Sequence, residues 1–536
     1  MTTRSLKAPD LLLAPRLEPA EVAALLGPAG IKEIARADAN LQAVADDPAA
    51  RQLLAEILEE LLSCLARSAD PDQALNYFER FTRAAVNKVH LLSYLKESPR
   101  TLEILAKTFG GSPYMAEILI RDPLSLYWVT DPLILDHCRR KRDLERELRR
   151  ALRPLKTEEK RLDFLRAFKR KEMLQIGVRD LLRLASVRET LASLSTLAEV
   201  LISAAYWICD SALRDEYEAL SRPGARKRFA GFTVLGMGKL GGGELNFSSD
   251  VDLIYLYASD EAGDSGISAP EYFRRLAQKI TAALSDVTSE GYVYRVDLRL
   301  RPEGRMGNIA YSLAGCDRYY RTRGETWERL ALLKAWPVAG DRALGRRFLE
   351  LMRPFIYDQP FDLKALNEVK SMKQRIDQQL SVRQQSRRNV KLGFGGIREI
   401  ELVVQSLQVF LGREFPRARA RNTLRSLRAL QEGRLLSREE RDTLTEAYLF
   451  LRDVENKLQI VNDAQTHSLP TTDEELGACA RRLGYPAAEQ FLADYRAHTS
   501  QVNRIFENVL GLAERFRVKG ARHEAIERTT GSTGKT

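Results

Sequence analysis

The chain has 536 residues, of which 44% are hydrophobic and 29% are charged, an ordinary balance for a globular protein. This length exceeds what a single hydrophobic core supports, so we expect two to four domains. Its 84 Lys and Arg against 73 Asp and Glu give a net charge of +11, an excess that permits a nucleic-acid surface but does not require one.

The cysteines and the apolar runs indicate the compartment. No cysteine stands at metal-ligand spacing from another cysteine or a histidine, and the five residues are odd in number and widely separated: Cys64, Cys138, Cys209, Cys316 and Cys479. We therefore expect reduced thiols. No run at the start is apolar enough for a signal peptide, and none reaches the ~18 residues of a membrane span. These observations predict a cytoplasmic protein without a membrane contact.

From about Glu18 to Leu220 the hydrophobic pattern is helical. Apolar residues at i, i+3, i+4 and i+7 mark one helix face at Leu54, Ile57, Leu58 and Leu61. Further helices are predicted over Tyr77–Tyr94, Thr101–Phe109, Tyr114–Ile120 and Leu162–Leu184. The basic run over 139–171 is typical of a solvated helix face, although a surface for an acidic partner stays open.

The period then changes from helical to alternating. We expect strands over Phe229–Gly236, Val251–Tyr257 and Gly291–Leu300, with a helix over Pro270–Ser289. From Phe348 the helical pattern returns, with long helices over Arg398–Leu411, Arg438–Val461 and Ala488–Phe516. The sequence thus predicts a predominantly helical α+β protein: a helical region 1–228, a mixed-sheet domain 229–345, a helical bundle 346–516 and a disordered tail 517–536.

A glycine-rich turn followed by two aspartates is the most informative local pattern. The segment 236–255 reads GMGKLGGGELNFSSDVDLIY. On a strand Asp250 and Asp252 point to the same face, and such adjacent carboxylates typically hold a divalent cation. Glycines let the backbone approach a phosphate. A plain hairpin would also explain the glycines. A dinucleotide site is disfavoured because another strand, not a helix, is expected after them.

A third acid lies on the next predicted strand. Asp297 shares a face with Arg295, Arg299 and Arg301, and one carboxylate among three guanidinium groups suggests that an anion completes the arrangement. A cross-strand ladder of ion pairs is the simpler alternative. Two aspartates on one strand, a helix and one aspartate on a second strand are typical of nucleotidyltransferases, in which the carboxylates hold Mg²⁺ (or Mn²⁺). The sequence therefore predicts Asp250, Asp252 and Asp297 as catalytic metal ligands.

Around these aspartates we expect a site for phosphate and nucleotide. Its predicted members are Gly236, Gly238, Lys239, Ser248, Ser249, Arg299 and Arg301. No RNA-binding motif accompanies them, so a nucleic-acid polymerase is disfavoured.

Long motifs resemble those of the bifunctional glutamine synthetase adenylyltransferase/adenylyl-removing enzymes. Besides 236–255 they are YRVDLRLRPEGRMG (294–307), FGGSPYMAEILIRDP (109–123), NVKLGFGGIREIELVVQ (389–405) and AYLFLRDVENKLQIVNDAQTHSLP (447–470). The resemblance implies a polymerase-β-like nucleotidyltransferase domain. It also implies glutamine synthetase as protein substrate, a PII-type signal protein as a possible partner, and a role in nitrogen regulation.

That family carries two nucleotidyltransferase domains, whereas this sequence has one aspartate trio, resembling the amino-terminal, adenylyl-removing half. The implied reaction is attack of inorganic phosphate on tyrosine-linked AMP, releasing ADP. Attachment of AMP from ATP, or a non-catalytic module binding glutamine synthetase, stays open. Gly395 and Gly396 are expected to precede a helix and to place Glu399 and Glu401 near its positive amino-terminal end, which alone is a sufficient structural account. In the alternative, Arg398 and Glu399 are accessory contacts to phosphate or to the partner protein.

Overall fold

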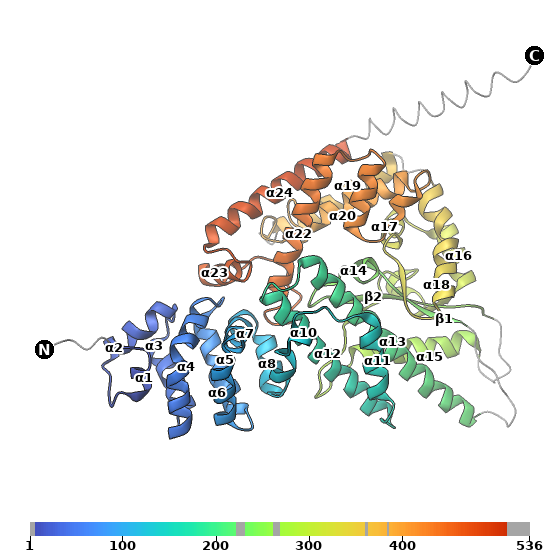
Figure 1. Ribbon diagram of the computed structural model, residues 1–536. Coiled ribbons are helices and arrows are strands. Elements are labelled where there is room, and N and C mark those ends of the chain that lie inside the picture. Colours follow the sequence, from blue (N-terminus) through green and yellow to red (C-terminus); the bar gives the residue numbers. More distant parts are fainter. Residues whose placement is uncertain (1–5, 221–230, 261–267, 360–362, 383–384, 512–536) are drawn as a thin grey trace, which may run out of the picture.

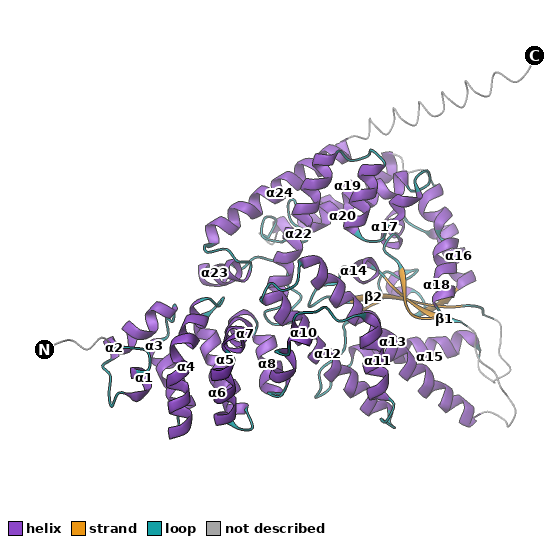
Figure 2. Ribbon diagram, viewed as in Figure 1, coloured by secondary structure: helices purple, strands orange, loops and turns teal. Residues whose placement is uncertain are grey.

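The computed structural model describes residues 6–220, 231–260, 268–359, 363–382 and 385–511. Figure 1 shows an arm of short helices leading through the long helices of the first half to a small sheet, with the carboxy-terminal helices on the far side of that sheet. Helices dominate and the sheet is confined to one place, as Figure 2 makes plain. The predicted fold class is confirmed.

Thirteen helices precede the sheet in the described residues. Their bounds are α1 Asp10–Leu13, α2 Pro19–Leu26, α3 Ile34–Val44, α4 Pro48–Ala66, α5 Pro71–Ala84, α6 Lys88–Glu97, α7 Pro99–Gly111, α8 Pro113–Arg121, α9 Ser125–Val129, α10 Pro132–Leu135, α11 Lys141–Leu152, α12 Glu158–Leu181 and α13 Val187–Leu220, with a 3₁₀ turn η1 at Gly27–Ala29. The predicted single helix Tyr77–Tyr94 is wrong. Extended Ala85 ends α5, and the Asn87 side chain accepts the His90 amide to cap α6.

The sheet has five strands: β1 Phe232–Gly236, β2 Val251–Tyr257, β3 Val296–Asp297, β4 Ala310–Ser312 and β5 Trp336–Gly340. Strand β1 pairs antiparallel with both β2 and β5, whereas β3 and β4 pair parallel with β2. Strand β2 has the predicted bounds. The strand expected over Gly291–Leu300 shrinks to two residues because β3 and β4 share one edge of β2, and the chain leaves that edge between them.

Both faces of the sheet are buried, and each belongs to a different core. Val234 and Tyr255 pack into the core of the amino-terminal helices, whereas Leu235 and Ile254 pack into the core of the carboxy-terminal helices. This alternation follows from the period of two along a strand. The sheet thus joins two helical regions, and helix α15 (Ala269–Ser285) covers the first face together with α13.

The remaining helices lie between the strands or follow the last strand. They are α14 Gly238–Gly242, α16 Leu313–Arg323, α17 Thr326–Leu332, α18 Arg342–Leu351, α19 Leu363–Val382, α20 Ile397–Leu411, α21 Thr423–Glu432, α22 Arg438–Gln459, α23 Asp473–Arg482 and α24 Ala488–Gly511, with short turns η2 Gly304–Met306, η3 Pro354–Asp358 and η4 Pro416–Arg419. The predicted domain boundary at 345 falls inside α18, which packs on β1 and β5. The predicted boundary at 228 and the tail 517–536 lie outside the described residues.

Helix α13 contains the one described stretch, Val187–Tyr217, that is long and apolar enough to cross a membrane by length and composition alone. Of its most apolar window 56% is buried, and the helix packs against α12, α15 and β5. Packing of this helix in the protein core is sufficient to explain its apolar composition.

Candidate functional site

A polar cavity of about 320 Å³ lies where the edge of the sheet meets the carboxy-terminal helices. It gathers residues far apart in sequence, from α14, β2, β3, α17 and α20. Of the predicted site residues, eight line it: Gly238, Lys239, Ser249, Asp250, Asp252, Asp297, Arg299 and Arg398. The fold therefore brings most of the predicted site into one pocket.

The three aspartates meet through the parallel pairing of β2 with β3, in which Asp252 lies beside Asp297. Two of them already have cationic partners. Asp250 Oδ1 accepts a hydrogen bond from Arg295 Nε at 2.7 Å, and Asp297 Oδ2 accepts one from Arg299 Nε at 2.8 Å. Within the described residues Asp252 has no such partner. Of the cross-strand ladder left open above, only the pair of Asp250 with Arg295 is present, because Arg299 follows Asp297 by two residues on the same segment.

Electrostatics single out Asp252. Burial, followed by repulsion from Asp297 and Asp250, raises its pKa to about 6. Burial acts in the same direction on Asp297, but hydrogen bonds from Arg299 outweigh it and hold the pKa of that carboxyl below its usual range. Lys391 and Lys239 act in the opposite direction without outweighing burial, so Asp252 is the carboxylate of the trio without a hydrogen-bonded cation in the described residues.

The donor set suits a hard divalent cation, because it consists of carboxylate oxygens on adjacent strands. In the described part of the chain, however, no three His, Cys, Asp or Glu side chains stand close enough together to hold a metal ion. The guanidinium groups of Arg295 and Arg299 occupy two of the three carboxylates. The trio fits a metal in its chemistry, and binding all three ligands requires Arg299 to leave Asp297.

Cations also line the pocket. Lys239 Nζ donates to Glu455 Oε1 at 2.9 Å, and burial lowers the Lys239 pKa to about 8 against the pull of Glu455. Arg398 Nη1 lies 3.4 Å from Glu401 Oε2. Lys391, which the sequence reasoning missed, also lines the pocket, and its ammonium group has no ion pair or hydrogen bond among the described residues. A cation without a partner is the one most available to an incoming anion.

Four predicted residues lie elsewhere. Gly236 ends β1, where an added Cβ would meet Val338 and Leu240 at 2.9 Å, so it serves close packing. Ser248 Oγ donates to the Asp463 carbonyl at 2.7 Å, away from the pocket.

Arg301 and Glu399 are likewise committed to structure. Arg301 donates to the carbonyls of Leu298 at 2.8 Å and Asn308 at 3.0 Å, fixing the loop between β3 and β4. Glu399 Oε1 lies 3.0 Å from Lys373 Nζ and is buried. Of the predicted accessory pair, only Arg398 faces the pocket.

Steric constraints require glycine at two positions of the turn that borders the pocket. Gly238 has φ +50°, and a Cβ there would lie 3.1 Å from Asp252 Oδ2. A Cβ on Gly241 would lie 1.8 Å from the Lys334 carbonyl oxygen. The turn continues into the five-residue helix α14, which the sequence did not predict, and not into the long helix of a dinucleotide site.

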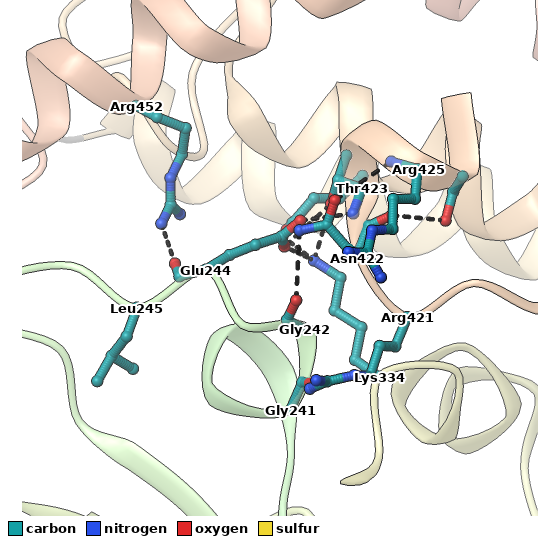
Figure 3. A network of polar contacts seen from close by, with 12 residues as sticks. Gly241, Gly242, Glu244, Leu245, Lys334, Arg421, Asn422, Thr423, Arg425 and Arg452 are labelled. Atoms are coloured by element: carbon teal, nitrogen blue, oxygen red, sulfur yellow. Dashed lines mark hydrogen bonds and ion pairs between the residues drawn. The ribbon is translucent and has the colours of Figure 1, made fainter. Parts of the chain in front are cut away.

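A buried network ties this turn to the carboxy-terminal helices (Figure 3). Lys334 Nζ donates to Glu244 Oε2 at 2.9 Å and to Glu401 Oε1 at 3.0 Å. Burial disfavours the charged lysine, but the two carboxylates outweigh burial and raise its pKa. Arg452 donates to the Glu244 carbonyl and Arg421 to the Gly241 carbonyl. No local sequence signal marks Lys334, because its partners Glu244 and Glu401 lie 90 and 67 residues away in the chain.

Comparisons with known proteins identify relatives of this chain by sequence. Residues 102–351 match the family model of glutamate-ammonia ligase adenylyltransferase, and residues 370–510 match that of PII-uridylyltransferase. Relatives named bifunctional glutamine synthetase adenylyltransferase/adenylyl-removing enzyme include those of Nitrosococcus oceani (38% identical over 76% of this chain and 42% of the relative), Xanthomonas campestris pv. campestris (40%, over 65% and 37%) and Stenotrophomonas maltophilia (43%, over 57% and 33%).

The chain thus spans less than half the length of these relatives. The matched region includes the glycine turn, the aspartates and the loop between β3 and β4. The chain belongs to the glutamate-ammonia ligase adenylyltransferase family and corresponds to the amino-terminal half of its bifunctional relatives.

Proposed function

We propose that this chain is a metal-dependent nucleotidyltransferase that acts on glutamine synthetase and removes AMP from its adenylylated tyrosine. The family match and the names of the relatives support the substrate class. The observation that carries the proposal is that Lys391, whose ammonium group has no ion pair or hydrogen bond in the described residues, lines the same pocket as Asp252, the carboxylate without a hydrogen-bonded cation. Such a pocket is suited to bringing two anions together in the presence of a cation.

In this reaction an oxygen of inorganic phosphate attacks the adenylyl phosphorus. The bond from that phosphorus to the tyrosine oxygen breaks, so that the products are ADP and a tyrosine side chain that takes up a proton. Both reacting groups are anionic, and their approach is unfavourable unless positive charge surrounds them. When bound by Asp250, Asp252 and Asp297, Mg²⁺ or Mn²⁺ would neutralise charge on the transferred group.

The chain's own cations divide the remaining work. We assign Lys391 to inorganic phosphate, because it is the pocket cation without a competing partner in the described residues. Lys239 and Arg398 are held by Glu455 and Glu401, so they present fixed positive charge to the adenylyl phosphate. Arg299 binds Asp297 in the free protein and would turn to phosphate when a metal takes that carboxylate.

The test is to mix the purified chain with adenylylated glutamine synthetase, inorganic phosphate and Mg²⁺ and to measure ADP. The double variant Asp250→Asn with Asp252→Asn should abolish ADP release while the circular dichroism spectrum and thermal midpoint change little. Asp317→Asn is a matched control. The Asp317 side chain is 26% exposed and forms an ion pair with Arg321 at 2.7 Å, and the Asp250 side chain is 27% exposed and forms an ion pair with Arg295 at 2.7 Å. Full activity in the double variant would remove the carboxylates from the mechanism.

The opposite direction, attachment of AMP from ATP, is the second candidate because the relatives' names include both activities. Incubation with labelled ATP and unmodified glutamine synthetase separates the two directions, since only attachment labels the substrate. A PII-type partner remains a prediction. If the chain released no ADP, incorporated no label and bound neither Mg²⁺ nor Mn²⁺ in calorimetry, a non-catalytic binding module would replace both proposals.

A further inference from the structure

A second cavity of about 880 Å³ adjoins the charged pocket. It is formed between α17 and α19. Three side chains, those of Trp327, Leu330 and Met372, line both cavities. The charged pocket therefore opens beside a larger space across an apolar wall that the two share.

Trp327 is the most unusual member of this wall. Its side chain is 37% exposed, and its Nε1 donates to Glu325 Oε2 at 2.6 Å. The polar edge of the indole is thus already bonded, and the apolar ring remains beside Leu330 and Met372. In the described part of the chain no ring or guanidinium group stacks on it. An accessible aromatic ring with this setting is suited to stacking a planar base.

The two cavities differ in the balance of their charges. The charged pocket has more cations than carboxylates in its lining: Lys239, Arg299, Lys334, Lys391 and Arg398 against Asp250, Asp252, Asp297 and Glu401. The second cavity has the carboxylates of Glu325 and Glu368, with Arg375 as its cation. Phosphate groups favour the first cavity and are disfavoured in the second, whereas a neutral group with N–H and O–H donors suits the carboxylates.

From this division we propose that the second cavity is the nucleoside subsite, with a purine stacked on Trp327 and the ribose hydroxyls and base edge directed to polar groups such as Asn367, Ser371 and Glu368. This proposal rests on the proposed function for the presence of an adenylyl group. Leu330 and Met372 would pack against the base beside Trp327, since a thioether packs well against an aromatic ring. The phosphate of the same nucleotide would then lie in the charged pocket.

The experiment uses the full chain and ADP, the product of the proposed reaction, in calorimetric titrations. Trp327→Ala should weaken ADP binding by about tenfold or more, because stacking of a base on an aromatic ring is lost. Trp327→Phe, which keeps a ring, should stay within about threefold of the parent. The affinity for inorganic pyrophosphate, which needs only the charged pocket, should be unchanged in both variants.

Trp207→Ala is the matched control, because Trp207 is 49% exposed and lies on α13, outside both cavities. It should bind ADP as the parent does. In the parent, ADP should also quench tryptophan fluorescence, and this quenching should disappear in Trp327→Phe.

Three results would overturn the subsite: no ADP binding by the parent, unchanged ADP affinity in Trp327→Ala, or equal losses for ADP and pyrophosphate. A rise in KM for adenylylated glutamine synthetase with unchanged ADP affinity would assign the cavity to the protein chain instead. ADP release from adenylylated glutamine synthetase is measured separately. If ADP binds through Trp327 but none is released, the subsite stands and the proposed function fails.

Discussion

Glu455→Gln tests how the helical bundle supports the pocket. The Glu455 carboxylate is fully buried on α22 and accepts hydrogen bonds from Lys239 Nζ at 2.9 Å and Asn246 Nδ2 at 2.7 Å. Arg452 Nη1 lies 3.3 Å away and adds a second positive charge. Glutamine keeps the shape of the side chain but removes its charge, so two buried cations lose their common counter-ion.

The expected loss follows from this geometry. Leaving a buried charge without its partner costs ~3–5 kcal/mol of unfolding free energy. Lys239 can relieve part of this cost by losing its proton, because burial already lowers its pKa to about 8. We therefore expect a loss near the lower end, about 3 kcal/mol at pH 7.5. Although burial opposes it, attraction to Lys239 and Arg452 holds the Glu455 pKa well below its usual range, so the loss should persist at neutral pH and shrink only in acid.

The assay is urea-induced unfolding at pH 7.5, followed by tryptophan fluorescence and arranged as a double-mutant cycle with Lys239→Met. Removing the unpaired lysine should recover part of the loss, so the double variant should be more stable than the sum of single effects by about 2 kcal/mol. Glu117→Gln is the control, because its pair with Arg80 is 50% and 40% exposed and should contribute less than about 1 kcal/mol. Additive single effects, or a Glu455→Gln loss no greater than the control, would refute the reasoning.

Three further outcomes are expected. Pyrophosphate affinity should fall from pH 7 to pH 9 in calorimetry, because Lys239 carries its charge only below its pKa of about 8, and Lys239→Met should flatten this change. Lys391→Ala should raise the KM for inorganic phosphate by about tenfold with little change in the KM for adenylylated glutamine synthetase, and equal changes would contradict its assignment. Gly241→Ala should lower the unfolding free energy by about 3 kcal/mol in urea titration, because its Cβ would lie 1.8 Å from the Lys334 carbonyl oxygen. Gly243→Ala is the control: its Cβ would meet no atom within 4 Å, and it should lower the unfolding free energy by only about 1 kcal/mol because its φ is +70°.

The local elements could be predicted where the pattern was set by the residues themselves. Strand β2 has the predicted bounds because, apart from Asp252, it consists of hydrophobic residues that are buried on both faces of the sheet. Strand β3 is shorter than predicted, because β3 and β4 pair along the same edge of β2. This division of the edge depends on the tertiary structure and has no local signal in the sequence. The alternation argument for Arg295 and Arg301 assumed a long strand. In the shorter one, Arg295 bonds Asp250 and Arg301 bonds loop carbonyls.

The candidate site was predictable to the same extent. The aspartates and the glycine turn carry a local spacing that reports their chemistry, so their convergence in one pocket could be expected. Lys391 lies in the motif 389–405 that resembles the family, but an isolated lysine has no spacing that marks it as a ligand. Only the structure shows that the neighbouring cations Lys239 and Arg398 are paired with carboxylates whereas Lys391 is not, in the described residues.

The pocket also shows why a division of the chain by secondary structure differs from a division by function. The predicted mixed-sheet domain 229–345 contains the aspartates, yet Lys391 and Arg398 come from the predicted helical bundle. Glu455 and Arg452 of that bundle hold Lys239 and the Glu244 carbonyl in place. Because these contacts are buried and charged, the sheet and bundle must be positioned together for the pocket to keep its charge balance. The smallest unit that can carry the proposed chemistry therefore extends from the sheet through α22.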